Sequence, residues 1–172
     1  MNQKTRLATR DDLEKIQAIF ESGRGYLAAQ GLPQWQNGYG PTGPDAALEI
    51  EADRGYVLLV GGVVSGYASL IPGPDGSPPL TEGEWDTSHS RYAALHRVAL
   101  DRAVRGRGLA AVFMREIIQR ARDLGYQDIR IDTHPENKIM QRVILKVGFT
   151  YRGIMHLPIP EGERFAYQLL ID

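Results

Sequence analysis

The stretch from residue 92 to residue 147 alternates between two hydrophobic periods, and this alternation limits the folds that the chain can adopt. Apolar, strand-like runs occupy Tyr92–Leu100 and Gln127–Asp132, whereas helical spacing of apolar residues marks Leu109–Leu124 and Lys138–Val147. A glycine follows each helical segment, as is common at helix ends. Because a helix between two strands carries the chain back across a sheet, these two strands are expected to be parallel neighbours.

The segments on either side of this unit predict antiparallel pairs. Tyr56–Val60 and Val63–Leu70 flank Gly61-Gly62, which is typical of a two-residue hairpin turn because both turn positions need a positive φ. Phe149–His156 and Glu163–Leu170 form the second expected pair, at the end of the chain. The order of elements therefore predicts a mixed sheet with antiparallel strands at both ends and a parallel pair in the middle.

The remaining segments predict shorter elements. A strand over residues 3–8 precedes the capping box Thr9-Arg10-Asp11-Asp12, which predicts that a helix begins there. A short helix is expected over Asp45–Ala52, after a stretch from Gly23 to Pro44 that is rich in glycine and proline. Residues 72–90 contain prolines and glycines throughout and are predicted to have no regular structure.

Length and composition exclude several classes of function. The 172 residues fit one domain, and the formal net charge of −1 argues against a general role on nucleic acid or on a membrane surface. The absence of cysteine excludes disulfides, thiolate metal sites and a cysteine nucleophile. No apolar run has the length of a signal peptide core or a membrane span, so a cytoplasmic location is expected.

The sequence Arg105-Gly106-Arg107-Gly108-Leu109-Ala110 opens the predicted crossover helix and is the strongest candidate for a ligand site. Glycine lets a ligand approach the backbone closely, and the first turn of a helix offers unpaired N–H groups and partial positive charge. Arginines are also concentrated here, at positions 91, 97, 102, 105 and 107. A phosphorylated ligand is therefore the expected occupant, against the alternative of a solvated arginine turn.

Two other phosphate-binding patterns are alternatives for this loop. The Walker loop is excluded because no Gly-Lys-Ser/Thr follows. A dinucleotide fingerprint fits Gly106, Gly108 and Ala111, and Asp132 ends the next strand, where a ribose-binding acid would lie. That motif normally begins at the end of the strand, whereas five residues separate Leu100 from Gly106 here.

Arg105, Gly108 and Ala110 also match the pattern Q/R-x-x-G-x-G/A, and the chain thereby resembles the GNAT superfamily of acyl-CoA-dependent N-acyltransferases. The strand that ends at Leu100 and the segment from Asn137 to Phe149 extend the resemblance. It implies an α/β (α+β) fold, with a mixed, mostly antiparallel sheet of about six to seven strands, helices on both faces and a central parallel pair. It also implies one N-acetyltransferase domain over residues 1–172, with acetyl-CoA as co-substrate and no metal.

The resemblance assigns the cofactor contacts to specific positions. The pyrophosphate of CoA would lie on Arg105, Gly106, Arg107, Gly108, Leu109 and Ala110, held mainly by main-chain N–H groups. The pantetheine arm would run along Val98, Ala99 and Leu100. Asn137 matches a position that contacts the pantetheine or the acceptor, although a place at the start of a helix, with Thr133-His134-Pro135-Glu136 as capping box, explains it equally well.

The implied reaction is attack of a neutral amine on the thioester, which requires a base because alkylamines are mostly protonated at neutral pH. His96 is the candidate, with a core histidine as the alternative, and His134 is the second candidate. Tyr26, Trp35 and Tyr39 are the candidate acceptor wall. Ile144 occupies the position where many relatives carry the tyrosine that protonates the thiolate, so the general acid is missing from its usual place.

The predicted function is direct acetyl transfer from acetyl-CoA to an amine of a small molecule or a peptide end. The alternatives are a CoA-binding protein with little catalysis and a nucleotide-binding oxidoreductase module. A homodimer is possible, and neither nucleic acid nor a membrane is an expected partner.

Overall fold

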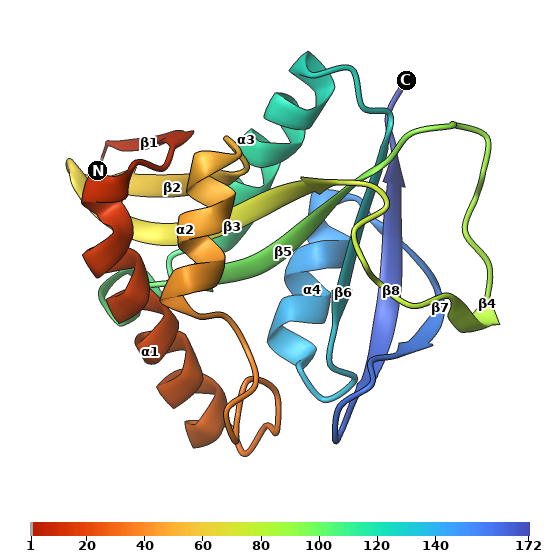
Figure 1. The fold of residues 1–172 in the computed structure, drawn as a ribbon, viewed down its shortest axis with the longest axis horizontal. Coiled ribbons are helices and arrows are strands. Elements are labelled where there is room, and N and C mark those ends of the chain that lie inside the picture. The colour runs from red at the N-terminus through yellow and green to blue at the C-terminus, as the bar shows by residue number, and fades with distance from the viewer. Residues whose placement is uncertain (1) are drawn as a thin grey trace. The chain divides into compact units, whose positions relative to one another are not determined.

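The structure is a computed structural model that describes residues 2–172. Its described part contains eight strands and four α-helices (Figure 1). The strands are β1 (Gln3–Leu7), β2 (Gly55–Val60), β3 (Val63–Pro72), β4 (Leu80–Gly83), β5 (Ala93–Leu100), β6 (Asp128–Thr133), β7 (Thr150–His156) and β8 (Glu163–Leu170). The helices are α1 (Leu13–Ala29), α2 (Gly43–Glu51), α3 (Leu109–Asp123) and α4 (Lys138–Val147), and two short 3₁₀ helices are η1 (Arg10–Asp12) and η2 (Arg102–Val104).

The strands are hydrogen-bonded in the order β1-β2-β3-β5-β6-β8-β7-β4. The pair β5–β6 is parallel, as the crossover through α3 predicts. The pairs β1–β2, β2–β3, β6–β8, β7–β8 and β4–β7 are antiparallel. The predicted mixed, mostly antiparallel sheet is confirmed, but it has eight strands rather than six to seven.

The chain divides into two compact units. The first unit runs to Leu70 and includes Arg97–Phe113, and the second contains Ile71–His96 and Met114–Asp172. In the first unit, α1 and α2 lie side by side (Figure 1). A buried cluster joins these two helices to β2, β3 and the end of β5; its members include Ile16, Ile19, Phe20, Ala46, Ile50, Val57, Tyr67 and Ala99.

A buried polar network lies within the first unit. The Tyr67 hydroxyl donates a hydrogen bond of 2.6 Å to Glu49 Oε1, and Arg97 Nη1 donates one of 2.6 Å to Glu49 Oε2. Burial and the Glu49 charge raise the pKa of Tyr67, so the phenol stays protonated and remains a donor. Arg97 itself has a φ of 57°, which is uncommon for a residue other than glycine and marks an irregularity in β5.

We expect Tyr67→Phe to lower the free energy of unfolding by about 1–2 kcal/mol, because a buried carboxylate loses one of its donors. Urea unfolding followed by circular dichroism measures this change. Tyr151→Phe is the matched control, since Tyr151 is 47% exposed and its stability effect should be close to zero. Equal stability of the Tyr67 variant and the wild type would show that this hydrogen bond contributes nothing.

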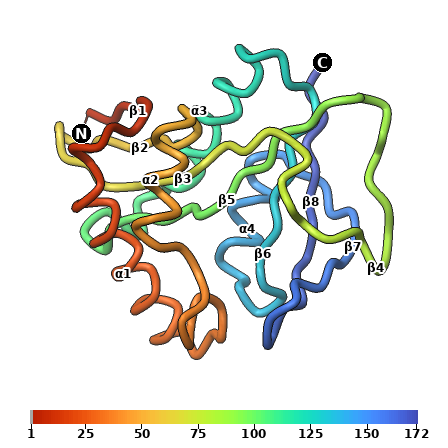
Figure 2. Tube along the Cα trace, viewed as in Figure 1, coloured from red at the N-terminus to blue at the C-terminus, as the bar shows by residue number. Residues whose placement is uncertain are grey.

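In the second unit, β8 pairs with β6 on one side and with β7 on the other (Figure 2). The strand β4 pairs with β7 and was not predicted from the sequence. It is four residues long, mostly exposed and set within a segment rich in proline, so it carries neither the length nor the alternation of a recognisable strand. The sequence predicts ranges for seven strands, and β4 is the eighth.

Candidate active site

Residues 105–108 form the loop that joins η2 to α3. The helix α3 begins at Leu109, as predicted. Gly106 and Gly108 have φ values of 78° and 73°, in the left-handed region that favours glycine. A Cβ atom added at either position would meet no protein atom within 4 Å, so both glycines border open space. The loop therefore combines an exposed backbone with the N–H groups of the first turn of α3.

Arg105 anchors this loop to the rest of the first unit. Its Nη2 donates hydrogen bonds to Ser22 Oγ (2.7 Å) and to the Leu100 carbonyl oxygen (3.0 Å), and its guanidinium lies 4.5 Å from the centre of the Tyr26 ring. Burial lowers the pKa of Arg105, although a guanidinium still keeps its charge. The side chain of Arg105 therefore ties the loop to Ser22 on α1 and to the end of β5.

Several arginines of this region make contacts within the protein, among them Arg91 over Tyr126, Arg97 with Glu49, and Arg105 with Ser22. The concentration of five arginines in the sequence predicted one positive cluster for a phosphate. In the structure, Arg102 and Arg107 are exposed next to the loop. The five arginines therefore do not form one cluster of cations around the loop.

The three residues expected to contact the pantetheine arm, Val98, Ala99 and Leu100, lie at the end of β5, in the first unit. Ala99 is part of the buried cluster, and Val98 and Leu100 are partly buried. The Leu100 side chain lies so close to Gly66 that a Cβ at Gly66 would come within 2.8 Å of it. The pairing of β5 with β6 is recorded at Ala93 and Ala94, three residues before the left-handed Arg97.

The three aromatic candidates for an acceptor wall lie in different environments. Tyr26 packs under the Arg105 guanidinium, and Trp35 packs against the buried cluster and close to Gly23. Tyr39 is 41% exposed. The packing of Tyr26 and Trp35 is explained by these contacts without a ligand.

The helix α1 continues through Gly23 to Ala29, so the irregular stretch that the sequence predicted from Gly23 to Pro44 is shorter in the structure.

His96 lies on β5, in the second unit, and contacts an acid that the sequence analysis did not identify. Its Nε2 is 2.7 Å from Asp75 Oδ2, and the Asp75 side chain is only 4% exposed. Asp75 also accepts hydrogen bonds from Tyr92 Oη (2.9 Å) and from Ser77 Oγ (2.8 Å). The aspartate therefore orients the imidazole and is itself held by two hydroxyl groups.

The protonation state of Asp75 follows from these contacts. Burial alone would raise the pKa of Asp75, but the hydrogen bonds from His96, Ser77 and Tyr92 outweigh it and hold the pKa well below its usual range. An ionised carboxylate can only accept hydrogen bonds, so His96 Nε2 must carry the hydrogen of this contact.

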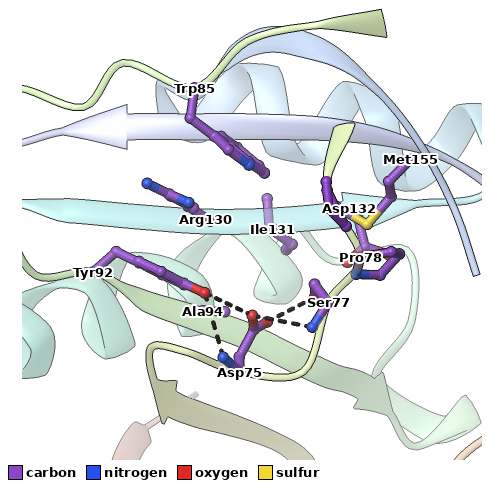
Figure 3. Close-up of a pocket in the computed structure, with 11 residues that line it drawn as sticks. Asp75, Ser77, Pro78, Trp85, Tyr92, Ala94, Arg130, Ile131, Asp132 and Met155 are labelled. Carbon is purple, nitrogen blue, oxygen red and sulfur yellow. Dashed lines mark hydrogen bonds between the residues drawn. The ribbon is translucent and has the colours of Figure 1, made fainter. Parts of the chain in front are cut away.

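A pocket of about 180 Å³ lies beside Asp75 within the second unit (Figure 3). One part of its wall is apolar, with Pro78, Ile131 and Met155 among its residues. Arg130 lies between the rings of Trp85 and Tyr92, with its guanidinium 4.4 Å and 3.9 Å from the two ring centres (Figure 3).

Asn137 caps α4, because its side-chain oxygen accepts a hydrogen bond of 3.2 Å from the Met140 N–H. The capping box expected over residues 133–136 is wrong: Thr133 ends β6, and its buried hydroxyl has no partner among the described residues. The His134 side chain accepts a bond from the Glu136 N–H, as a helix-entry residue would. Burial lowers the pKa of His134.

Ile144 is fully buried and belongs to the hydrophobic core. The hydroxyl that many relatives place there has no counterpart at this position of the chain.

Among residues 2–172, no group of three or more His, Cys, Asp or Glu side chains could hold a metal ion. That the reaction needs no metal stays a prediction. No helix in the same part of the chain is long and apolar enough to cross a membrane.

The chain belongs to the acetyltransferase (GNAT) family, whose model matches residues 25–149. This confirms the resemblance found in the loop and in the segment that follows it. A comparison with curated proteins found no match.

Solved structures agree with the family. The chain is 32% identical to a GNAT-family acetyltransferase from Streptococcus agalactiae, with a TM-score of 0.89 and with 99% of this chain and 96% of that chain covered. A candidate acetyltransferase from Salmonella typhimurium, solved with its cofactor acetyl-CoA, has 22% identity, a TM-score of 0.71 and coverage of 100% and 95%. A ribosomal-protein-alanine N-acetyltransferase from Brucella melitensis has 18% identity, a TM-score of 0.72 and coverage of 98% and 99%. At these lower identities, the last two show the fold alone.

Proposed function

We propose that this protein is an acetyl-CoA-dependent N-acetyltransferase that moves the acetyl group directly to an amine of a small molecule or a peptide end. The observation that carries the proposal is the open, left-handed pair Gly106 and Gly108 at the start of α3, in a chain of the acetyltransferase (GNAT) family. The proposal treats residues 1–172 as one N-acetyltransferase domain.

In this proposal, the main-chain N–H groups of residues 105–110 bind the diphosphate of CoA. Exposed N–H groups at a helix start stabilise a bound anion, and the helix dipole adds to this effect. The backbone of Val98–Leu100 accepts the pantetheine arm as an added strand would. The acetyl-CoA complex of the Salmonella typhimurium protein supports the choice of this co-substrate.

His96 acts as the general base in the proposed reaction. Asp75 fixes the imidazole through Nε2, so the nitrogen that takes the proton from the attacking amine is Nδ1. The amine nitrogen forms a bond to the thioester carbonyl carbon, the carbon–sulfur bond breaks, and CoA leaves as a thiolate. With a thiol pKa of about 8.5, the thiolate leaves without a protein acid at Ile144.

Acetyl transfer is tested by incubating the protein with acetyl-CoA and a panel of amines that includes alkylamines, amino acids and peptide N-termini. Amine-dependent release of free thiol, with acetylated product found by mass spectrometry, is the expected result. Stabilisation by CoA without turnover on any acceptor class would favour the CoA-binding alternative instead.

We expect Gly108→Ala to weaken CoA affinity by about 10-fold or more, which corresponds to about 1.4 kcal/mol. The added methyl group enters the open space in which the diphosphate of CoA is proposed to contact the main chain of the protein. Alanine is preferred to valine because a β-branched residue at a φ of 73° would strain the loop. Calorimetric titration with CoA measures the affinity.

Gly62→Ala is the matched control for this experiment. Gly62 lies in the β2–β3 turn with a φ of 81°, and a Cβ there also meets no protein atom within 4 Å. Both variants should lose about 1 kcal/mol of stability from the left-handed conformation. If Gly108→Ala bound CoA as tightly as Gly62→Ala does, the loop would not be the diphosphate site.

A further inference from the structure

Asp132 lines the pocket of the second unit and differs from the other acids near it. It is partly buried, and within residues 2–172 its carboxylate makes no hydrogen bond or ion pair. Burial raises the pKa of Asp132; the charges of His96 and Arg164 act in the opposite direction, and Asp75 raises it further. The carboxylate oxygens of Asp132 are not among the fully buried atoms that lack a partner within residues 2–172, so they keep some exposed surface beside the pocket.

The neighbouring acids show that this part of the fold normally satisfies its carboxylates. Asp75 is bonded to His96, Tyr92 and Ser77. Asp128 accepts bonds from Arg130 at 3.2 Å and 3.0 Å and another of 2.9 Å from Gln168. The absence of such donors around Asp132 leaves its oxygens available to a ligand that brings its own.

The nearby cations, Arg130 and Arg164, do not donate hydrogen bonds to Asp132. Arg130 stands two residues before Asp132 on β6, but its guanidinium is bonded to Asp128 and enclosed by two aromatic rings, away from Asp132 in Figure 3. Arg164 is buried and donates to the main-chain carbonyl oxygens of Glu161 and Glu163. Its charge acts on Asp132 from a distance, without an ion pair.

The pocket around Asp132 also limits the size and polarity of a ligand. Its volume of about 180 Å³ is below the roughly 300–1,000 Å³ typical of sites for drug-sized ligands. Pro78, Ile131 and Met155 supply apolar surface close to the carboxylate (Figure 3). An ammonium group on a short apolar chain matches both features, since it donates up to three hydrogen bonds and carries the opposite charge.

We infer that this pocket binds the acceptor as a protonated primary amine, with the ammonium group on Asp132 and the apolar chain against Ile131 and Met155. The inference rests on the proposed function and adds its substrate class: small, cationic, largely apolar monoamines. A bound ammonium favours the ionised carboxylate, so ligand and acid stabilise each other's charge. Asp132 is a binding residue in this account, and His96 remains the base.

Binding of n-butylammonium and of n-butanol, measured by NMR titration without acetyl-CoA, tests the inference independently of turnover. The wild type should bind the amine at least about 10-fold more tightly than the alcohol, the range of one charge-assisted hydrogen bond. Asp132→Asn should lose about 10- to 100-fold in amine affinity and keep its affinity for CoA. Asp123→Asn, which removes the same charge from an exposed site, should bind the amine as the wild type does.

The outcomes test the amine site at Asp132 and the acetyltransferase function separately. Wild-type amine affinity in Asp132→Asn, or no preference of the wild type for the amine over the alcohol, would overturn the inference even if acetyl transfer occurs. Binding that depends on Asp132, without thiol release from any amine, would leave the amine site standing and remove the transferase proposal. If Asp132→Asn did not fold, amine-specific shifts of the Trp85 indole and Ile131 methyl signals in the wild type would still decide.

Discussion

His96→Gln is expected to lower kcat for acetyl transfer by about 100- to 10,000-fold, the usual contribution of a general base. Its affinity for CoA should stay unchanged, because no CoA contact is assigned to the imidazole. The glutamine side chain can still donate to Asp75 but cannot take a proton from the amine. Steady-state kinetics at saturating acetyl-CoA, with CoA titrations on the same preparation, measure both quantities.

His156→Gln is the matched control for this change. His156 is exposed on β7, and it contacts Thr81 and Glu163 rather than the Asp75 network. It should keep wild-type kcat. A kcat for His96→Gln within about threefold of the wild type would mean that water or another group removes the proton, and His96 would then be a structural histidine.

Asp75→Asn is expected to lower the free energy of unfolding by about 2–4 kcal/mol at pH 7, because a buried, ionised acceptor of three side-chain donors is lost. The pKa of Asp75 lies below its usual range, so its stabilisation is present above the ordinary aspartate pKa of about 3.9 and is lost as pH falls toward the folded-state pKa. The gap between wild type and variant should therefore shrink below about pH 4.

Urea unfolding at pH 7 and at about pH 3.5 measures this gap, with Asp123→Asn as the exposed-acid control. Turnover should fall together with stability in Asp75→Asn, because the imidazole of His96 loses the acceptor that orients it. Equal stability of variant and wild type at pH 7 would contradict the assigned hydrogen bonds. A gap that is the same at both pH values would show that the Asp75 charge does not contribute.

Local sequence patterns predicted most of the fold. Gly61 and Gly62 both have the positive φ that the hairpin turn requires, at 58° and 81°. The bounds of α4 and β8 match the periodic segments, because a glycine ends the helix and a turn precedes the strand. The strand β4 could not be predicted, since its pairing with β7 joins segments about 70 residues apart and its own pattern is too short.

The candidate site was only partly predictable, because its side-chain partners depend on distant contacts. The motif located the loop at Arg105–Ala110 but could not show that Arg105 turns toward Ser22. The strand pattern located His96, whereas Asp75 lies in a proline-rich segment with no periodic signal. Asp132 has no hydrogen-bond donor because the fold places the nearby donors on other groups. The spacing of residues in the sequence does not predict this arrangement.

A crystal structure of the protein with CoA would test the central claim most directly. We expect the diphosphate within hydrogen-bond distance of the main-chain nitrogens of Gly106, Gly108 and Leu109, with the pantetheine arm beside Val98–Leu100. A coenzyme bound elsewhere while this loop remains empty would contradict the account.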